Sequence, residues 1–246
     1  MRISVANISK KIGGAEFSAT VQAVARQVHQ DFAPLWGMDA DVRGIAMNRN
    51  TKPNPELTLS DVILYVGEID DDPQKVADAV GYHDLNNKGI PFGFVFTDVA
   101  AKIGETWSTT LSHEVLELLA DPDINLLVVG PHPKNPKGVA LRTYEVCDPV
   151  QADSYDIDGI TVSNFVTPLY FARLPYPTTT RTNYLNLGLD RFGVRPGGYY
   201  SYFDLATRRW NDIFGQGAES RTKAKELLGV ARRARRHAGL ELADAP

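Results

Sequence analysis

The chain has 246 residues, of which 43% are hydrophobic and 23% charged, and its formal net charge at pH 7 is -4. This is the composition of an ordinary globular protein, long enough for one large domain or for one domain with a substantial appendage. The weak negative charge gives no global reason to expect a nucleic acid or an anionic membrane as partner.

The first residues, MRISVANISKKIGG, lack the apolar core of a signal peptide, and no segment approaches the length of a membrane span. The single cysteine, Cys147, excludes an internal disulfide framework and fits a reducing compartment. We therefore expect a soluble cytoplasmic protein that does not associate with membranes, or one delivered by a route that leaves no mark in the sequence.

Apolar patterns in the first hundred residues predict strands over residues 3–8, 42–47, 61–70 and 91–97. Between the first two, apolar residues recur at helical spacing and predict a helix that Pro34 ends: Phe17, Val21, Val24, Val28 and Phe32. A short helix is expected over residues 73–80, and the polar stretch 81–89 reads as a loop.

The segment from Thr106 to Asp121 predicts a second helix, capped by Thr106 or Ser108 and ended before Pro122. One side of it is apolar and carries Trp107, Leu111, Val115 and Leu118. At 100° per residue, His113 and Glu117 fall together on the opposite side. The pattern indicates a helix that buries one stripe and directs a histidine and a carboxylate towards a site.

Further along, we predict a strand over 139–147 and a hairpin over 155–162 that turns at Asp158-Gly159, a dipeptide suited to a type I′ turn. A loop follows that carries Pro168, Pro175 and Pro177. A second hairpin is expected from residues 197–204 and 209–214, before a basic helical tail over 221–237. These elements together predict an α+β fold.

His113, Glu114 and Glu117 form the pattern His-Glu-x-x-Glu. Residues four apart on a helix have Cβ atoms roughly 5–6 Å apart, so His113 and Glu117 can reach one ion. Both side chains bind zinc at about 2.0–2.2 Å. Glu114, one step round the helix, would then act as general base towards a metal-activated water. The alternative is a surface helix with ordinary polar residues.

The pattern resembles the His-Glu-x-x-His motif of the zincin-like metallopeptidases, with glutamate in place of the second histidine. A carboxylate ligand lowers the Lewis acidity of the ion and widens the choice of metal beyond Zn²⁺. The resemblance covers roughly residues 1–125 and implies a mixed sheet with a backing helix (17–32) and an active-site helix. It implies that the segment around residues 92–96 is an edge strand, which would pair with an extended peptide substrate.

The chain also resembles a group of poorly characterised bacterial and phage-encoded proteins over most of its length. The shared segments are Gly81-Tyr-His-Asp84, Ser112-His-Glu-Val-Leu-Glu117, Asp121-Pro122, Glu145-Val-Cys-Asp-Pro149, Val162-Ser-Asn-Phe-Val-Thr-Pro168 and Pro196-Gly-Gly-Tyr199. We expect residues 1–176 to form the catalytic domain. Residues 177–246 would form a C-terminal extension, a hairpin with a basic helical tail, packed on the same domain.

A catalytic metal needs three protein ligands and an open position. Glu145 resembles the downstream glutamate of the gluzincins and is the first candidate, although it falls on a predicted strand. Asp148 is the second, as a ligand or as an orienting partner of His113. Asp123 lies where metzincins place their third ligand, ten residues after the histidine, but a helix-ending loop residue is the preferred interpretation.

Several other residues have a possible role in the site. Tyr170 or Tyr155 would donate a hydrogen bond to the oxyanion of a tetrahedral intermediate, as tyrosines do in several zincins. His83-Asp84 would bind substrate or support the site, although a histidine in a turn is the commoner explanation. Cys147 lacks a positioned histidine in the sequence and reads as a small buried residue.

The sequence thus predicts a metal-dependent hydrolase, a peptidase with Zn²⁺ and a peptide or protein substrate. The alternative is a non-catalytic, phage-related binding or assembly protein in which the ion is structural. Arg232, Arg233, Arg235 and Arg236 in the tail leave nucleic-acid binding open. A solvated terminal helix is the preferred interpretation of that tail.

Overall fold

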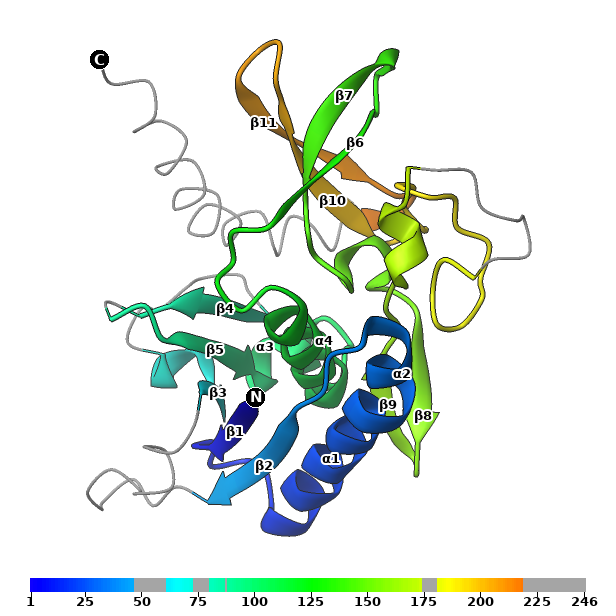
Figure 1. The fold of residues 1–246 in the computed structure, drawn as a ribbon. Helices are drawn as coiled ribbons and strands as arrows, with labels where there is room; N and C mark the ends of the chain where they lie inside the picture. Colours follow the sequence, from blue (N-terminus) through cyan, green and yellow to red (C-terminus); the bar gives the residue numbers. More distant parts are fainter. Residues whose placement is uncertain (47–60, 73–79, 87, 174–180, 219–246) are drawn as a thin grey trace.

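The computed structural model describes residues 1–46, 61–72, 80–86, 88–173 and 181–218 (Figure 1). Within these residues the fold is α+β, which confirms the predicted class. No helix among them has the length and apolar character needed to cross a membrane. The predicted helix over 73–80, apart from its last residue, and the basic tail over 221–237 lie outside the described residues.

A mixed sheet of five strands, the first sheet, forms the base of the fold. Its strands in spatial order are β2 (Asp41–Ala46), β1 (Arg2–Asn7), β3 (Val62–Gly67), β5 (Pro91–Phe96) and β4 (Gly81–Leu85). The pairs β2–β1, β1–β3 and β3–β5 are parallel, whereas β4 runs antiparallel to β5.

The position of β4 corrects two predictions. The segment 92–96 is not the edge strand, because β5 lies between β3 and β4. The edge is β4, which falls in the stretch 81–89 that reads as a loop. The polar residues of this stretch made it look like a loop. In the structure one of them, His83, is completely buried on the strand and pairs in register with Gly93.

The first long helix begins at Gly14 and continues past the predicted end at Pro34. It comprises α1 (Gly14–Arg26), the π-helical turns of η1 (Gln27–Phe32) and α2 (Ala33–Trp36), and it ends at Gly37 with a φ of 67°. Pro34 lies in the first turn of α2, where the missing N–H of a proline costs no helical hydrogen bond. Gly37 adopts the left-handed conformation that commonly ends helices.

Helix α4 (Trp107–Ala120) follows the short α3 (Thr97–Lys102) and confirms the predicted helix over 106–121. It contacts β4 and β5 of the first sheet, while α1 contacts β2 and also touches α4 (Figure 1). On its other side α4 contacts the hairpin formed by β8 (Ser154–Ile157) and β9 (Ile160–Ser163). Asp158 and Gly159 connect these strands with φ of 53° and 79°, as a type I′ turn requires.

A second, antiparallel sheet stands beyond α4 (Figure 1). Its order is β11 (Arg209–Phe214), β10 (Tyr199–Asp204), β7 (Asn135–Thr143) and β6 (Leu127–His132). The hairpin β10–β11 confirms the prediction for 197–214. The predicted strand over 139–147 is wrong at its end, because β7 stops at Thr143, so Glu145 does not lie on a strand.

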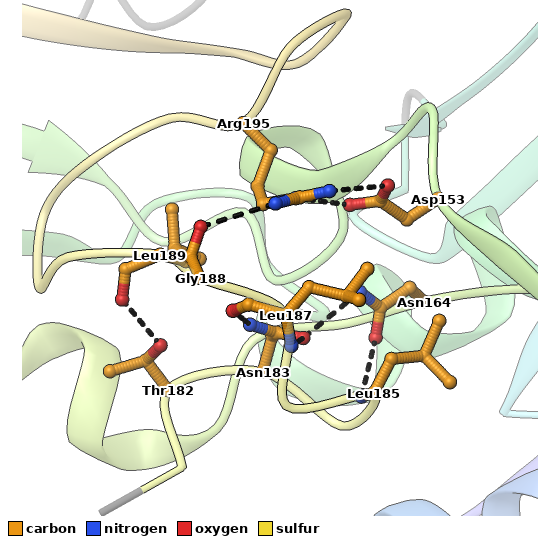
Figure 2. Close-up of polar contacts among 9 residues, drawn as sticks. All are labelled: Asp153, Asn164, Thr182, Asn183, Leu185, Leu187, Gly188, Leu189 and Arg195. Atoms are coloured by element: carbon orange, nitrogen blue, oxygen red, sulfur yellow. Dashed lines mark hydrogen bonds and ion pairs between the residues drawn. The ribbon is translucent and has the colours of Figure 1, made fainter.

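Residues 182–195, which lie between η5 (Pro168–Phe171) and β10, make contacts through buried amides and an ion pair (Figure 2). Arg195 pairs with Asp153 through Nε at 2.8 Å and also donates to the carbonyl of Gly188 (Figure 2). The side chains of Asn164 and Asn183, both fully buried, bond to each other and to the turn at residues 185–187. Residues 183–195 are thereby fastened to the residues on either side of the hairpin β8–β9.

Candidate metal centre

The helix that carries the motif is enclosed by the rest of the protein. Every residue of α4 is buried except Thr109, so the prediction of a one-sided apolar helix is wrong. The side that carries His113 and Glu117 is covered as well. Trp107 stacks on Phe17 of α1, and Ser108 donates to the carbonyl of Thr161 on β9 at 2.7 Å. These contacts fix the start of the helix.

A buried polar relay fixes the middle of α4. Ser112 donates through its hydroxyl to the side-chain oxygen of Gln27 at 2.6 Å and accepts the backbone N–H of Ser163 at 2.9 Å. Gln27, in the π-helical turns of η1, also donates to the carbonyl of Ser163 at 2.8 Å. Because Ser112 directly precedes His113, the relay sets the position of the histidine along the helix axis.

Two carboxylates, potential ligands like the imidazole itself, lie close to His113. Its Nε2 lies 3.0 Å from a carboxylate oxygen of Glu117 and 3.3 Å from one of Asp148, the first residue of η4 (Asp148–Val150). In a tetrahedral shell with bonds of about 2.0–2.2 Å, ligand atoms stand about 3.3–3.6 Å apart. The 3.3 Å distance matches that spacing, whereas the 3.0 Å between His113 and Glu117 is a hydrogen-bond length that would have to grow by about 0.3 Å around an ion. A histidine and two carboxylates are residue types that bind a small divalent ion.

The charges of this cluster also favour a bound cation. Burial opposes a charge on His113, but the carboxylates of Glu117 and Asp148 outweigh it and raise the pKa of His113 to about 10. Burial raises the pKa of Glu117 to about 7, with Asp148 and Glu145 adding to it and His113 acting against it. At neutral pH the imidazole of His113 therefore holds a proton between the carboxylates, and a cation that displaced this proton would meet the same carboxylates.

The three candidates for the third ligand differ in their burial and in their position relative to His113. Asp148 is buried and in contact with His113. Glu145 is also buried and raises the pKa of Glu117, which places it near the cluster. Asp123 is exposed, in agreement with its interpretation as a loop residue.

The thiol of Cys147 lies close to His113 and Glu117, whereas the sequence indicated only a small buried residue. Its Sγ and the ligand atoms of His113 and Glu117 all lie within 4.8 Å of one another, and its backbone N–H donates to Glu117 at 3.3 Å. Burial, together with the charges of Glu117 and Asp148, holds the pKa of the thiol well above its usual range. The sequence concealed this because the thiol meets the histidine only through the fold.

Glu114 points towards the edge strand of the first sheet. Its Oε2 lies 2.7 Å from Nδ1 of His83 on β4, and the imidazole is completely buried. The interpretation of His83 as a turn residue is therefore wrong. Ligand atoms of His83, Glu114 and Glu117 also lie within 4.8 Å of one another, so this pair adjoins the first cluster. In the sequence, His83 was noticed only as part of the stretch Gly81-Tyr-His-Asp84.

The tyrosines predicted to bind an oxyanion have other partners. The hydroxyl of Tyr170, in η5, donates to the carbonyl of Gly193 at 2.7 Å, and burial raises its pKa. The hydroxyl of Tyr155 donates to Asp31 at 2.7 Å. Within the described residues no contact supports the catalytic role predicted for Tyr170, because its proton is already donated to a backbone carbonyl.

Comparisons of the chain with protein-family models, curated proteins and solved structures found no match.

Proposed function

We propose that the protein is a metal-dependent hydrolase, a peptidase of the zincin-like type that cleaves a peptide or other amide bond. The observation that carries the proposal is the convergence of Glu117 and Asp148 on Nε2 of His113, at 3.0 Å and 3.3 Å, inside the protein. His113, Glu117 and Asp148 would hold the ion, and Zn²⁺ is the expected metal. Glu145 is retained as a neighbouring carboxylate that adds to the negative charge of the site.

A divalent ion at this place would supply Lewis acidity, which polarises a carbonyl and lowers the pKa of a bound water towards about 7. Glu114 is the group that would accept the proton of the attacking water and return it to the leaving amine. Glu114 suits this task because it neighbours the ligand His113 in sequence and its carboxylate lies within 4.8 Å of a ligand atom of Glu117. General acid–base catalysis of this kind contributes typically about 10²–10⁴-fold to a rate.

The edge strand β4 is the argument for an extended peptide as substrate. β4 ends the strand order of the first sheet and pairs only with β5 among the described strands. A peptide that added to β4 would form backbone hydrogen bonds without regard to its sequence. It would also lie next to Glu114, because His83 of β4 contacts that carboxylate.

One observation favours the alternative, a non-catalytic binding or assembly protein with a structural ion. The thiol of Cys147 lies close enough to His113 and Glu117 to complete a closed shell with Asp148. Structural zinc sites are closed, whereas catalytic sites keep an open position. Substitution with cobalt tests this, since a thiolate ligand gives a charge-transfer band in the near ultraviolet that Cys147→Ser would remove.

The proposal is tested by metal analysis and by cleavage of labelled casein. Wild type purified without added metal should contain close to stoichiometric zinc or another transition metal, and His113→Ala should lose it. Glu114→Gln should keep the metal and lose hydrolysis by about 10²–10⁴-fold. A wild-type protein that stays metal-free after supplementation would end the hydrolase proposal, and an active Glu114→Gln enzyme would remove the role of the base.

A further inference from the structure

His83 and Glu114 form a buried pair between the edge strand and the motif helix. The exposed fraction is 0% for His83 and 4% for Glu114, and the atoms Nδ1 and Oε2 are 2.7 Å apart. As a general base Glu114 would be ionised and could only accept, so Nδ1 of His83 would be the donor. Inside a protein such a charge-assisted bond is strong and directional.

The backbone of β4 is shaped to make this contact. A Cβ atom at Gly81 would lie 2.6 Å from the methyl of Thr110 and 3.2 Å from Oε1 of Glu114, so only glycine lets the strand approach α4 here. Gly81 and His83 are two residues apart and therefore face α4 from the same side of the strand. Gly93, which pairs with His83 in the register, likewise has no side chain next to the imidazole.

We infer that His83 is a positioning residue for Glu114, an inference that rests on the proposed function and deepens it. The hydrogen bond holds one carboxylate oxygen, so the orientation of the base is set by the strand that would receive the substrate. A peptide that added to β4 would bind to the same strand that aligns the base. Binding at the edge and alignment of Glu114 would then be coupled through a single side chain.

The competing interpretation makes His83 a ligand of a second ion with Glu114 and Glu117. The distance argues against it. Two ligands of one tetrahedral ion stand about 3.3 Å or more apart. The 2.7 Å between His83 and Glu114 falls about 0.6 Å short of that spacing, about twice the shortfall of the 3.0 Å pair His113–Glu117, and it is the length of a charge-assisted hydrogen bond.

The test compares His83→Asn with His83→Leu, two side chains of similar size of which only asparagine donates a hydrogen bond. Both are measured as the zinc-loaded full chain, with labelled casein as the probe and with melting temperature and zinc content recorded. We expect both variants to keep the zinc content of wild type. His83→Leu should lose about 10–100-fold in kcat with little change in KM, and His83→Asn should recover most of that loss. His29→Ala, at an exposed site on η1, is the neutral control.

Equal kcat values for the asparagine and leucine variants would overturn the positioning role while leaving the hydrolase proposal intact. Two zinc ions in wild type and one in His83→Leu would also overturn it, because His83 would then be a ligand. If the wild-type chain binds no zinc or cleaves no peptide, the proposed function is wrong, and the positioning role is wrong with it. The three failures are therefore distinguishable.

Discussion

The tight approach of β4 to α4 gives a prediction that does not depend on the function. In Gly81→Ala the new methyl group would lie 2.6 Å from the methyl carbon of Thr110 and 3.0 Å from the carbonyl oxygen of Phe94. Carbon atoms pack best at about 3.5–4.0 Å, so the overlap with Thr110 is roughly 1 Å. Because the neighbours belong to a buried helix and to a paired strand, relief requires a shift of the backbone. Overpacking of this kind typically costs about 1–3 kcal/mol.

The free energy of unfolding, measured by urea denaturation on the metal-free chain, is the appropriate assay. Gly81→Ala should lower it by about 1–3 kcal/mol. Thr110→Ser removes the methyl that clashes while keeping the hydroxyl, so the double variant should recover part of that loss. Gly14→Ala is the matched control: nothing lies within 4 Å of its Cβ position at the start of α1, and the change should be neutral or stabilising by up to about 1 kcal/mol.

A Gly81→Ala chain as stable as wild type would refute the close packing of β4 on α4. So would equal losses in the single variant and in the double variant with Thr110→Ser, since the clash would then lie elsewhere. The same substitution should also reduce hydrolysis, because the new methyl would lie 3.2 Å from Oε1 of Glu114.

Two further predictions concern the metal. Asp148→Asn should weaken zinc binding by more than the roughly 10–100-fold that is typical when a residue supporting a ligand is lost, whereas Glu145→Gln should stay within that range. A competition assay with a chromophoric chelator measures both affinities. A larger loss in Glu145→Gln than in Asp148→Asn would make Glu145 the ligand. The raised pKa of His113, about 10, means that the metal-free site holds a proton at neutral pH that zinc must displace. The apparent zinc affinity should therefore rise by at least about tenfold per pH unit between about pH 6 and 8, and an affinity independent of pH would contradict the protonated site.

The sequence predicted the elements that depend on local pattern. Helix α4 follows from a run of apolar residues with a proline after it, although Thr106 at its N-cap position makes no capping hydrogen bond through its side chain. The turn at Asp158-Gly159 follows from residues that tolerate a positive φ. The pair His113 and Glu117 also follows from local geometry, because four residues on a helix bring two side chains to one side whatever surrounds them.

The sequence misplaced elements whose identity depends on distant partners. His83 looked like part of a polar loop, but it is a buried strand residue that pairs with β5 and has its hydrogen-bond partner, Glu114, 31 positions away. Pro34 looked like the end of a helix, but the π-helical turns of η1 place it in a new first turn.

The choice among possible ligands was decided only by the tertiary structure. Glu145, Cys147 and Asp148 lie within four positions of one another, and their spacing does not show which of them meets His113. The end of β7 at Thr143 and the short turn of η4 bring Asp148 to within 3.3 Å of the imidazole. A helical pair is fixed by the period of the helix, which is a local property. A third ligand comes from another part of the chain, so its position depends on how the sheets and loops pack around the helix.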